Sequence, residues 1–133
     1  MKPATLSDNQ QDSVEEVLRK NFPHGHSEFI PLMMRLLDLH SRKNKDYAGG
    51  GNPLGNFHRV ANLLSQYPNL DPSDPRVVAL TYAFKQIDAV MWLLCTNRDG
   101  EVEGISDRLQ DIAVYCMLAM ILDGERKSDE LGA

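Results

Sequence analysis

Apolar residues recur three and four positions apart along most of this chain, a spacing that gathers side chains on one side of a helix. Alternation of apolar and polar residues, which is typical of half-buried strands, is almost absent, and no Asn-Gly hairpin turn occurs. The sequence therefore predicts an all-α fold, a helical bundle of about four long helices plus a short N-terminal helix. A length of 133 residues suits one domain, 1–133, with a core over about 13–125 and frayed ends.

Capping residues and prolines give the expected helix boundaries. Ser13, with Glu16 three positions later, forms the capping-box pattern of a short first helix that ends near Phe22. A proline at the first position of a helix suggests two further starts, after the caps Asn52 and Asp74. The expected helices cover about 13–22, 27–48, 53–66, 75–96 and 103–124.

The last expected helix is apolar on every side between Ile112 and Leu122. Helices of this kind lie centrally or at a subunit interface, and a domain of this size offers little room to bury one. We therefore expect a homodimer or a higher homo-oligomer. Cys95 and Cys116 lie inside apolar helical segments without a short Cys-x-x-Cys spacing, so both are expected to be reduced core residues rather than zinc ligands.

Charge and hydropathy argue against two classes of partner. A formal charge of -5 argues against binding to nucleic acid, which depends on a basic surface. The longest apolar run, 112–122, is well short of the ~20 residues that cross a bilayer, and the polar N-terminus shows no signal-peptide pattern. No membrane association is expected, and the expected location is the cytoplasm.

Three carboxylates on the last expected helix are candidate metal ligands. Glu103, Asp107 and Asp111 recur every four residues, so they share one side of the helix, where like charges repel one another. Asp111 directly precedes the apolar segment, where an unpaired carboxylate is costly. Oxygen ligands in this arrangement suit Mg²⁺, with a phosphate completing its shell. The alternative is a solvated helix face whose acidic residues favour the helix N-terminus.

The preceding helix carries Lys85 and Asp88, three residues apart and therefore on one side. One interpretation is an ion pair between them on the outer surface. The other places Asp88 beside Asp107 and Asp111 and directs Lys85 to a phosphate. Trp92, on the same helix, is expected in the core.

Residues 40–60, "HSRKNKDYAGGGNPLGNFHRV", join two helices with an unusual concentration of polar side chains. The basic side chains in the last turn of the expected helix 27–48, Lys43 among them, either interact favourably with the helix dipole or contact phosphates. The glycines that follow allow the backbone to approach a ligand closely. No nucleophile pattern occurs, so metal-assisted hydrolysis fits better than covalent catalysis. The candidate nucleotide-binding residues in this stretch are Lys43, Asn44, Asp46, Tyr47, Asn56 and His58.

Three segments together resemble a known group of proteins: "KNKDYAGGGNPLGNF", "YAFKQIDAVMWLL" and "EGISDRLQDIAVYCMLAMIL". They resemble the small, often phage-encoded nucleotide-modification-associated domains, which are similar to the MazG-like all-α nucleoside triphosphate pyrophosphohydrolases. The resemblance covers about residues 27–124. It implies a helical bundle, commonly a dimer or tetramer, that holds Mg²⁺ with carboxylates on two helices. Water then attacks the α-phosphate and releases a nucleoside monophosphate and pyrophosphate.

Mapped onto this chain, the resemblance implies that Asp107 and Asp111 hold the metal, with Asp88 as the candidate from the preceding helix. One departure stands out. The MazG pattern has an early Glu-x-x-Glu pair, whereas the long second expected helix offers only Glu28 and Asp38, ten residues apart. Asp46 is a candidate to fill this gap.

Three hypotheses follow. The first is a Mg²⁺-dependent pyrophosphohydrolase that acts on a (deoxy)nucleoside triphosphate in phage nucleotide metabolism, in the host cytoplasm. The second, favoured by the missing Glu-x-x-Glu pair, is a non-catalytic phage protein that binds a nucleotide or a host partner. The third is a purely structural helical oligomer without a ligand.

Overall fold

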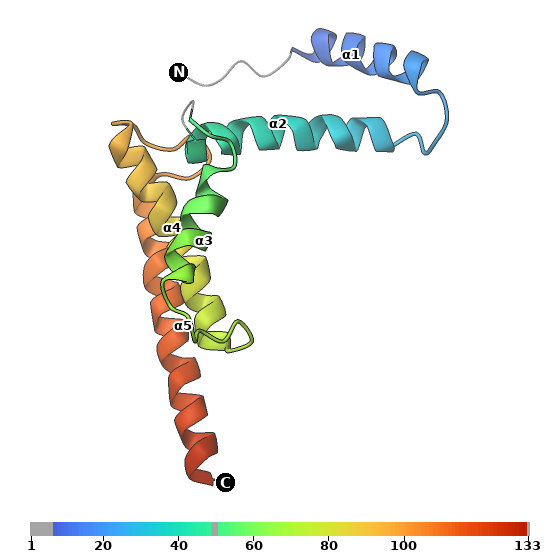
Figure 1. Ribbon diagram of the computed structural model, residues 1–133. Coiled ribbons are helices and arrows are strands. Elements are labelled where there is room, and N and C mark those ends of the chain that lie inside the picture. Colours follow the sequence, from blue (N-terminus) through green and yellow to red (C-terminus); the bar gives the residue numbers. More distant parts are fainter. Residues whose placement is uncertain (1–6, 49–50, 133) are drawn as a thin grey trace. The chain divides into compact units, whose positions relative to one another are not determined.

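The computed structural model of the chain describes residues 7–48 and 51–132. The regular elements in this part of the chain are α1 (Asp8–Asn21), α2 (Phe29–Ala48), α3 (Gly55–Ser65), α4 (Pro75–Cys95) and α5 (Ile105–Gly132) (Figure 1). The predicted all-α class is therefore confirmed. The chain forms two compact units, one ending at Asn44 and one beginning at Lys45, which is a finer division than the single domain expected from its length.

The first unit contains α1 and most of α2. α1 begins before the expected cap at Ser13, because Ser7 caps it instead. The Ser7 hydroxyl accepts the backbone N–H of Gln10 at 3.3 Å, and the Gln10 side chain accepts the backbone N–H of Ser7 at 2.9 Å. Glutamine completes a capping box as well as glutamate does, so this earlier pattern also marked a helix start. Arg19 donates to the Ser27 carbonyl at 2.9 Å, which ties the end of α1 to the residues before α2.

The second unit begins with the last turn of α2 and continues with α3 to α5. Asn52 does not cap α3 as expected, since its side chain accepts the N–H of Leu54 at 2.9 Å in a turn that precedes the helix. Pro53 therefore lies in this turn. Asp74 caps α4 as predicted: its carboxylate accepts the N–H of Arg76 at 2.9 Å, and a proline occupies the first turn.

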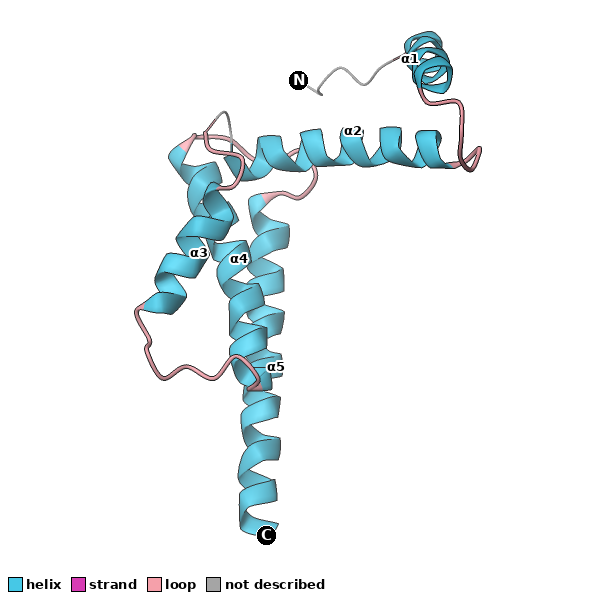
Figure 2. Ribbon diagram, turned by 45° about the vertical axis from the view of Figure 1, so that its right-hand side comes forward, coloured by secondary structure: helices cyan, strands magenta, loops and turns pink. Residues whose placement is uncertain are grey.

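α4 and α5 pack side by side and antiparallel, and they form the core of the second unit (Figure 2). Two contacts set their register. The Tyr82 and Tyr115 ring centroids are 5.7 Å apart, and the Gln86 amide donates to Asp111 at 3.1 Å. The side of α4 that contacts α5 is made of small and aliphatic residues, which let the helix axes approach closely. Its buried apolar members are Ala79, Ala83, Ala89, Val90 and Leu93.

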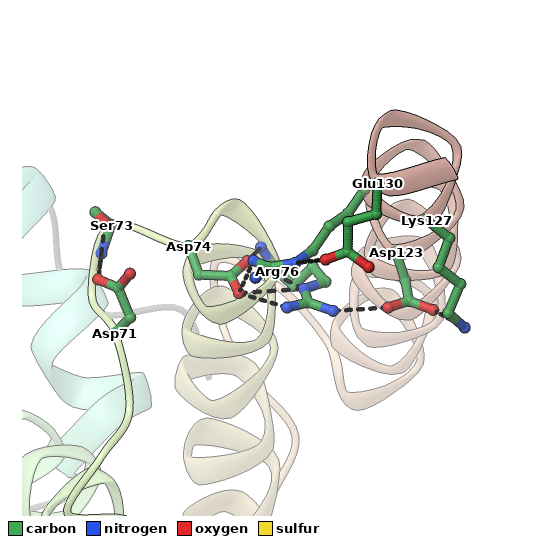
Figure 3. A network of polar contacts seen from close by, with 8 residues as sticks. Asp71, Ser73, Asp74, Arg76, Asp123, Lys127 and Glu130 are labelled. Carbon is green, nitrogen blue, oxygen red and sulfur yellow. Dashed lines mark hydrogen bonds and ion pairs between the residues drawn. The ribbon is translucent and has the colours of Figure 1, made fainter. Parts of the chain in front are cut away.

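α5 remains helical well past its expected end at Gly124. Ion pairs hold this extension against the start of α4 (Figure 3). Asp123 accepts from Arg76 at 2.7 Å, and Arg126 reaches the carboxylate of Asp74 at 3.3 Å. The C-terminal segment, expected to be frayed, is helical as far as Gly132 and makes charged contacts with residues that are distant in the sequence.

Cys95 and Cys116 are both exposed, which corrects the expectation that they are core residues. They lie on sides of α4 and α5 that point away from the contact between these helices. Large apolar side chains are exposed on the same helices, among them Met91, Met117 and Met120. The apolar surface of α5 is thus only partly covered within the described part of this chain.

Among the described helices, α4 is the one whose length and apolar composition would suffice to cross a membrane. One third of that stretch, 33%, is buried against the rest of the protein. Core helices of soluble proteins often pass the same test, so this composition alone carries little weight. Lys85 and Asp88 interrupt the apolar run of α4 in the sequence.

Candidate functional site

The second unit brings together residues from three segments: the last turn of α2, the middle of α4 and the first turns of α5. A polar network connects them, running from Asp46 through Arg108 and Gln86 to Asp111. Asp46 and Asp111 were both predicted as site residues. Arg108 and Gln86, which join them, were not.

Asp46 is completely buried, and its carboxylate holds the loop between α4 and α5. One oxygen accepts the backbone N–H of Glu101 at 2.7 Å and the other accepts that of Val102 at 2.8 Å. These two hydrogen bonds are named here the Asp46 clasp. Next to it, Arg98 donates to the backbone carbonyls of Lys45 and Asp46. Lys45 forms an ion pair with Glu101 at 2.6 Å. With both oxygens bonded and no exposed surface, the Asp46 carboxylate shapes this loop, which differs from its expected role of contacting a ligand or metal.

Arg108 supplies the positive charge inside the network, and its side chain is only 2% exposed. Its guanidinium donates to the Gln86 amide oxygen at 2.8 Å and to the Tyr47 hydroxyl at 3.3 Å. It also lies 3.9 Å from the Asp46 carboxylate and 3.6 Å from that of Glu103. A buried carboxylate is costly without a partner cation, and Arg108 and Arg98, each 3.9 Å from the Asp46 carboxylate, provide the compensating positive charge.

Gln86 of α4 links Arg108 to Asp111, two residues of α5. Its amide oxygen accepts from Arg108, which leaves its amide nitrogen to donate to Asp111 Oδ2 at 3.1 Å. Asp111 is half-buried beside the apolar segment of α5. The partner that the sequence analysis required for Asp111 is therefore a neutral amide, which uses one oxygen of the carboxylate.

The Tyr47 ring lies close to two cations from different helices. The Arg108 guanidinium carbon is 4.9 Å from the ring centroid, and the Lys85 ammonium is 5.7 Å from it. Both distances fall within the range of a cation–π contact. Lys85 is exposed, so its charge remains accessible to an anion. Tyr47, Lys85 and Asp111, all predicted site residues, thus belong to one connected group.

Asp88 has a different neighbour from the one expected. Arg59 of α3 donates Nε to its Oδ1 at 2.6 Å and Nη2 to its Oδ2 at 2.9 Å. These hydrogen bonds raise the pKa of the Arg59 guanidinium. The same guanidinium lies 5.0 Å from the ring centre of Trp92, which is half-buried rather than fully in the core. The ion pair that joins α3 to α4 is therefore Arg59–Asp88, and not Lys85–Asp88.

The structure does not gather Asp88, Asp107 and Asp111 into one cluster. Residues 7–48 and 51–132 contain no group of three or more His, Cys, Asp or Glu side chains placed to hold a metal ion. The reason is helical geometry: Gln86 faces Asp111, and a residue two positions further along a helix points about 200° away. Asp88 is thus turned toward α3. This corrects the expectation of a three-carboxylate site.

Asp107 and Asp111 fit a smaller site. They are four residues apart on α5 and therefore neighbours on one side of it. Asp107 is exposed, and its carboxylate accepts only a long hydrogen bond, 3.2 Å, from the Gly104 N–H within the described contacts. Mg²⁺ is commonly held by one or two carboxylates together with substrate phosphates and water. The oxygens of Asp107 and the remaining oxygen of Asp111 match this donor set.

Among the other predicted residues, Lys43, Asn56 and His58 have no described hydrogen bond or ion pair with the connected group. Lys43, exposed, and Asn44, half-buried, belong to the first unit. Asn56 is half-buried and His58 is exposed, both in the first turns of α3.

Within the glycine stretch 49–51, Gly51 has a structural role. A Cβ atom placed on Gly51 would lie 2.9 Å from Cζ2 of Trp92, closer than real Cβ contacts. The backbone therefore needs glycine here to pass over the indole ring, whereas the sequence analysis assigned the glycines to contact with a ligand. Gly49 and Gly50 lie outside the described residues.

Apolar hollows in the described part of the chain lie elsewhere. One, of about 620 Å³, is in the first unit, and its lining includes Leu18, Phe22, Phe29, Ile30 and Met33. Two others, of about 190 and 400 Å³, lie between the end of α3 and the start of α4. The residues of the polar network line none of these three hollows.

Sequence reasoning missed the residues that connect the network. Gln86 and Arg108 carried a usable signal, since each is a polar residue on the side of its helix that also carries buried or half-buried apolar positions. A polar side chain at such a position is expected to have a partner. Arg59 and Arg98 carried no comparable signal, because their partners lie on other segments of the chain.

Comparisons with protein-family models, curated proteins and solved structures give no match to this chain.

Proposed function

We propose that this protein binds a nucleoside triphosphate together with Mg²⁺ and hydrolyses it to a nucleoside monophosphate and pyrophosphate. One observation carries the proposal: Tyr47, Lys85 and Asp111, predicted independently from three segments, belong to one connected group. The resemblance of these segments to phage-encoded and MazG-like enzymes supports the choice of a nucleotide and of a role in phage nucleotide metabolism.

Each residue in the proposed site has a stated task. Asp107 and Asp111 hold Mg²⁺, which supplies charge neutralisation of the phosphates and polarises them for attack by water. Lys85 contacts a phosphate oxygen, because its ammonium is exposed beside the Tyr47 ring. Arg108 and Gln86 orient Asp111. Asp88 has no part in metal binding in this proposal, since both its oxygens bond to Arg59.

A second candidate is a nucleotide-binding protein without hydrolytic activity. The observation that favours it is the engagement of Asp88 by Arg59, which leaves two carboxylates where the resemblance implies a larger metal set. In this case the same residues bind the nucleotide, and the biological output is capture of the nucleotide or control of a host partner.

The test combines turnover with binding. The protein is incubated with each NTP and dNTP and Mg²⁺, and products are separated by anion-exchange chromatography. Thermal unfolding is followed in parallel with the same nucleotides, because a bound ligand raises the apparent stability. The enzyme proposal expects a monophosphate product that Asp107→Asn abolishes and Asp129→Asn, at an exposed acidic position near the end of α5, leaves unchanged.

The outcomes separate the candidates. A melting shift without a monophosphate product rejects hydrolysis and supports the binding protein. The absence of both product and melting shift with every nucleotide rejects both candidates and leaves the structural oligomer.

A further inference from the structure

The hollow of about 400 Å³ between the end of α3 and the start of α4 is an aromatic and apolar surface within the second unit. Its volume falls within the ~300–1,000 Å³ of ligand pockets. Tyr67 and Tyr82 line it and are 54% and 53% exposed. The other lining residues include Leu64, Leu70, Val78 and Thr81. The described lining contains no charged side chain, so the hollow suits a flat, uncharged group.

The hollow and Lys85 lie on one side of α4. Val78, Thr81 and Tyr82 precede Lys85 by seven, four and three residues, which is the spacing of one helical stripe. At a rise of ~1.5 Å per residue, these positions lie about 5–10 Å along the helix from Lys85. The hollow therefore continues the proposed nucleotide site beyond its phosphate end.

The contact between α4 and α5 gives the same order along the helices. Gln86 donates to Asp111, and one turn away Tyr82 packs edge-on against Tyr115 with ring centroids 5.7 Å apart. Tyr115 follows Asp111 by four residues, which is also about one turn of α5. The carboxylate of Asp111 and the ammonium of Lys85 thus come first, and the tyrosine pair comes next, beside the hollow.

We infer that this hollow receives the base of a nucleoside triphosphate whose phosphates and Mg²⁺ lie at Lys85, Asp107 and Asp111, an inference that rests on the proposed function. A nucleotide has an anionic end and a flat aromatic end. The surface has the matching order, with an exposed ammonium and carboxylates at one end and tyrosine and aliphatic side chains at the other. Exposed tyrosine rings offer a base a surface on which to stack.

The lining also indicates the class of substrate. Thr81 donates its hydroxyl to the Val77 carbonyl at 2.7 Å, so this oxygen is left to act as an acceptor. The described lining includes no amide, acidic or basic side chain that could read the hydrogen-bonding edge of a base. Apolar pockets discriminate weakly, whereas sites that hydrogen-bond their substrate reject an analogue by about 10⁴-fold. The substrate class is therefore nucleoside triphosphates with any of the common bases.

Calorimetry with two matched ligands tests the assignment. The full-length protein is titrated, with Mg²⁺ present, with the α,β-methylene analogues of ATP and of methyl triphosphate, which carries the same phosphates without a nucleoside. We expect the ATP analogue to bind at least about tenfold more tightly, which is the size of effect that base stacking provides. Val78→Trp fills the hollow, so it is expected to remove this difference by weakening the binding of the ATP analogue alone.

Two further variants keep the test decisive. Val17→Trp is the matched control, because Val17 is 57% exposed on α1 and lies outside the hollow. Tyr67→Ser removes an exposed ring from the lining and is expected to weaken the binding of the ATP analogue about tenfold. Binding of the methyl triphosphate analogue shows that each variant is folded, and Tyr67→Ser decides the outcome if Val78→Trp fails to fold.

The outcomes separate this inference from the proposed function. Equal affinity of the wild-type protein for both analogues overturns the base site and leaves the phosphate site standing. An unchanged preference for the ATP analogue in Val78→Trp and Tyr67→Ser does the same. Binding of neither analogue overturns the proposed function and this inference with it. The GTP analogue is expected to bind within about tenfold of the ATP analogue, and a difference of about 10⁴-fold overturns the broad substrate class.

Discussion

The carboxylate of Asp46, at the end of α2, accepts the backbone N–H of Val102 at 2.8 Å across a separation of 56 residues. Together with the N–H of Glu101, this contact determines where the chain turns before α5 begins. The start of α5 carries Asp107 and Asp111, so these two hydrogen bonds to Asp46 also determine where the carboxylates of Asp107 and Asp111 lie. A buried side chain with no exposed surface thus controls the geometry of the proposed site.

Removal of the Asp46 carboxylate is expected to destabilise the protein strongly. Asp46→Ala leaves two backbone donors without their acceptor and removes the carboxylate that lies 3.9 Å from the buried Arg108 guanidinium. Losing one partner of a buried charged pair costs about 3–5 kcal/mol. Urea denaturation followed by circular dichroism measures the free energy of unfolding. Asp38→Asn serves as the control, because Asp38 is an exposed partner of Arg42 and such pairs contribute less than ~1 kcal/mol. Equal losses in the two variants would contradict the assigned role of Asp46.

The Arg59–Asp88 pair is expected to show a measurable coupling. Double-mutant cycles with alanine at each position should give a coupling energy of about 1 kcal/mol, since the pair is bidentate and Asp88 is largely buried. Trp92 is the single tryptophan, so Arg59→Lys, which removes the guanidinium 5.0 Å from its ring centre, is expected to change its fluorescence. A coupling near zero with unchanged fluorescence would show that Arg59 does not hold α3 against α4.

Lys85 is expected to contribute to nucleotide affinity through its charge. Lys85→Met keeps much of the side-chain length and is expected to weaken Mg²⁺–nucleotide binding about tenfold, or ~1.4 kcal/mol, with little change in folding. Calorimetry with a non-hydrolysable triphosphate analogue measures the Kd, and added salt should reduce the affinity of the wild-type protein more than that of the variant. Lys20→Met, at an exposed position on α1, is the matched control. An unchanged Kd in Lys85→Met would remove Lys85 from the site.

Acid is expected to weaken the contact between the start of α4 and the extension of α5. Hydrogen bonds from Arg76 lower the pKa of Asp74 to about 2, and bonds from Lys127 and Arg76 also lower the pKa of Asp123. The ordinary pKa of Asp is about 3.9, so the folded protein binds fewer protons than the unfolded chain in this range. The stabilising contribution is therefore complete above about pH 4 and is lost as the pH falls toward 2.

Asp74→Asn tests this dependence. The amide can still cap α4, but it cannot titrate, so the loss of stability between about pH 4 and 2 should be smaller than in the wild-type protein. Urea denaturation at a series of pH values measures the slope, and Asp129→Asn, at an exposed position, provides the comparison. The same slope in the wild type and in Asp74→Asn would exclude Asp74 as a source of the acid sensitivity.

Local sequence patterns accounted for much of the helical structure. The Asp74 cap with its following proline lies where it was expected, because both act on backbone groups within a few residues. The predicted helix caps Ser13 and Asn52 were wrong, also for local reasons. Ser7 caps α1 instead of Ser13, and the Asn52 side chain forms a turn before α3. The candidate site was only partly predictable: the carboxylate spacing on α5 gave Asp107 and Asp111, but nothing near Asp88 in the sequence showed that Arg59 would bind it.

The amino-acid sequence alone determined the helical class, the cap of α4 and the side of α5 that carries Asp107 and Asp111, since these depend on backbone geometry and on spacing along one helix. Tertiary structure decided that Asp46 is buried against a loop and that Asp88 faces α3. It also decided that α4 and α5 leave large apolar side chains such as Met91, Met117 and Met120 exposed. These features depend on how segments distant in the sequence pack against one another. The contacts of a charged or apolar side chain therefore cannot be derived from its own helix alone.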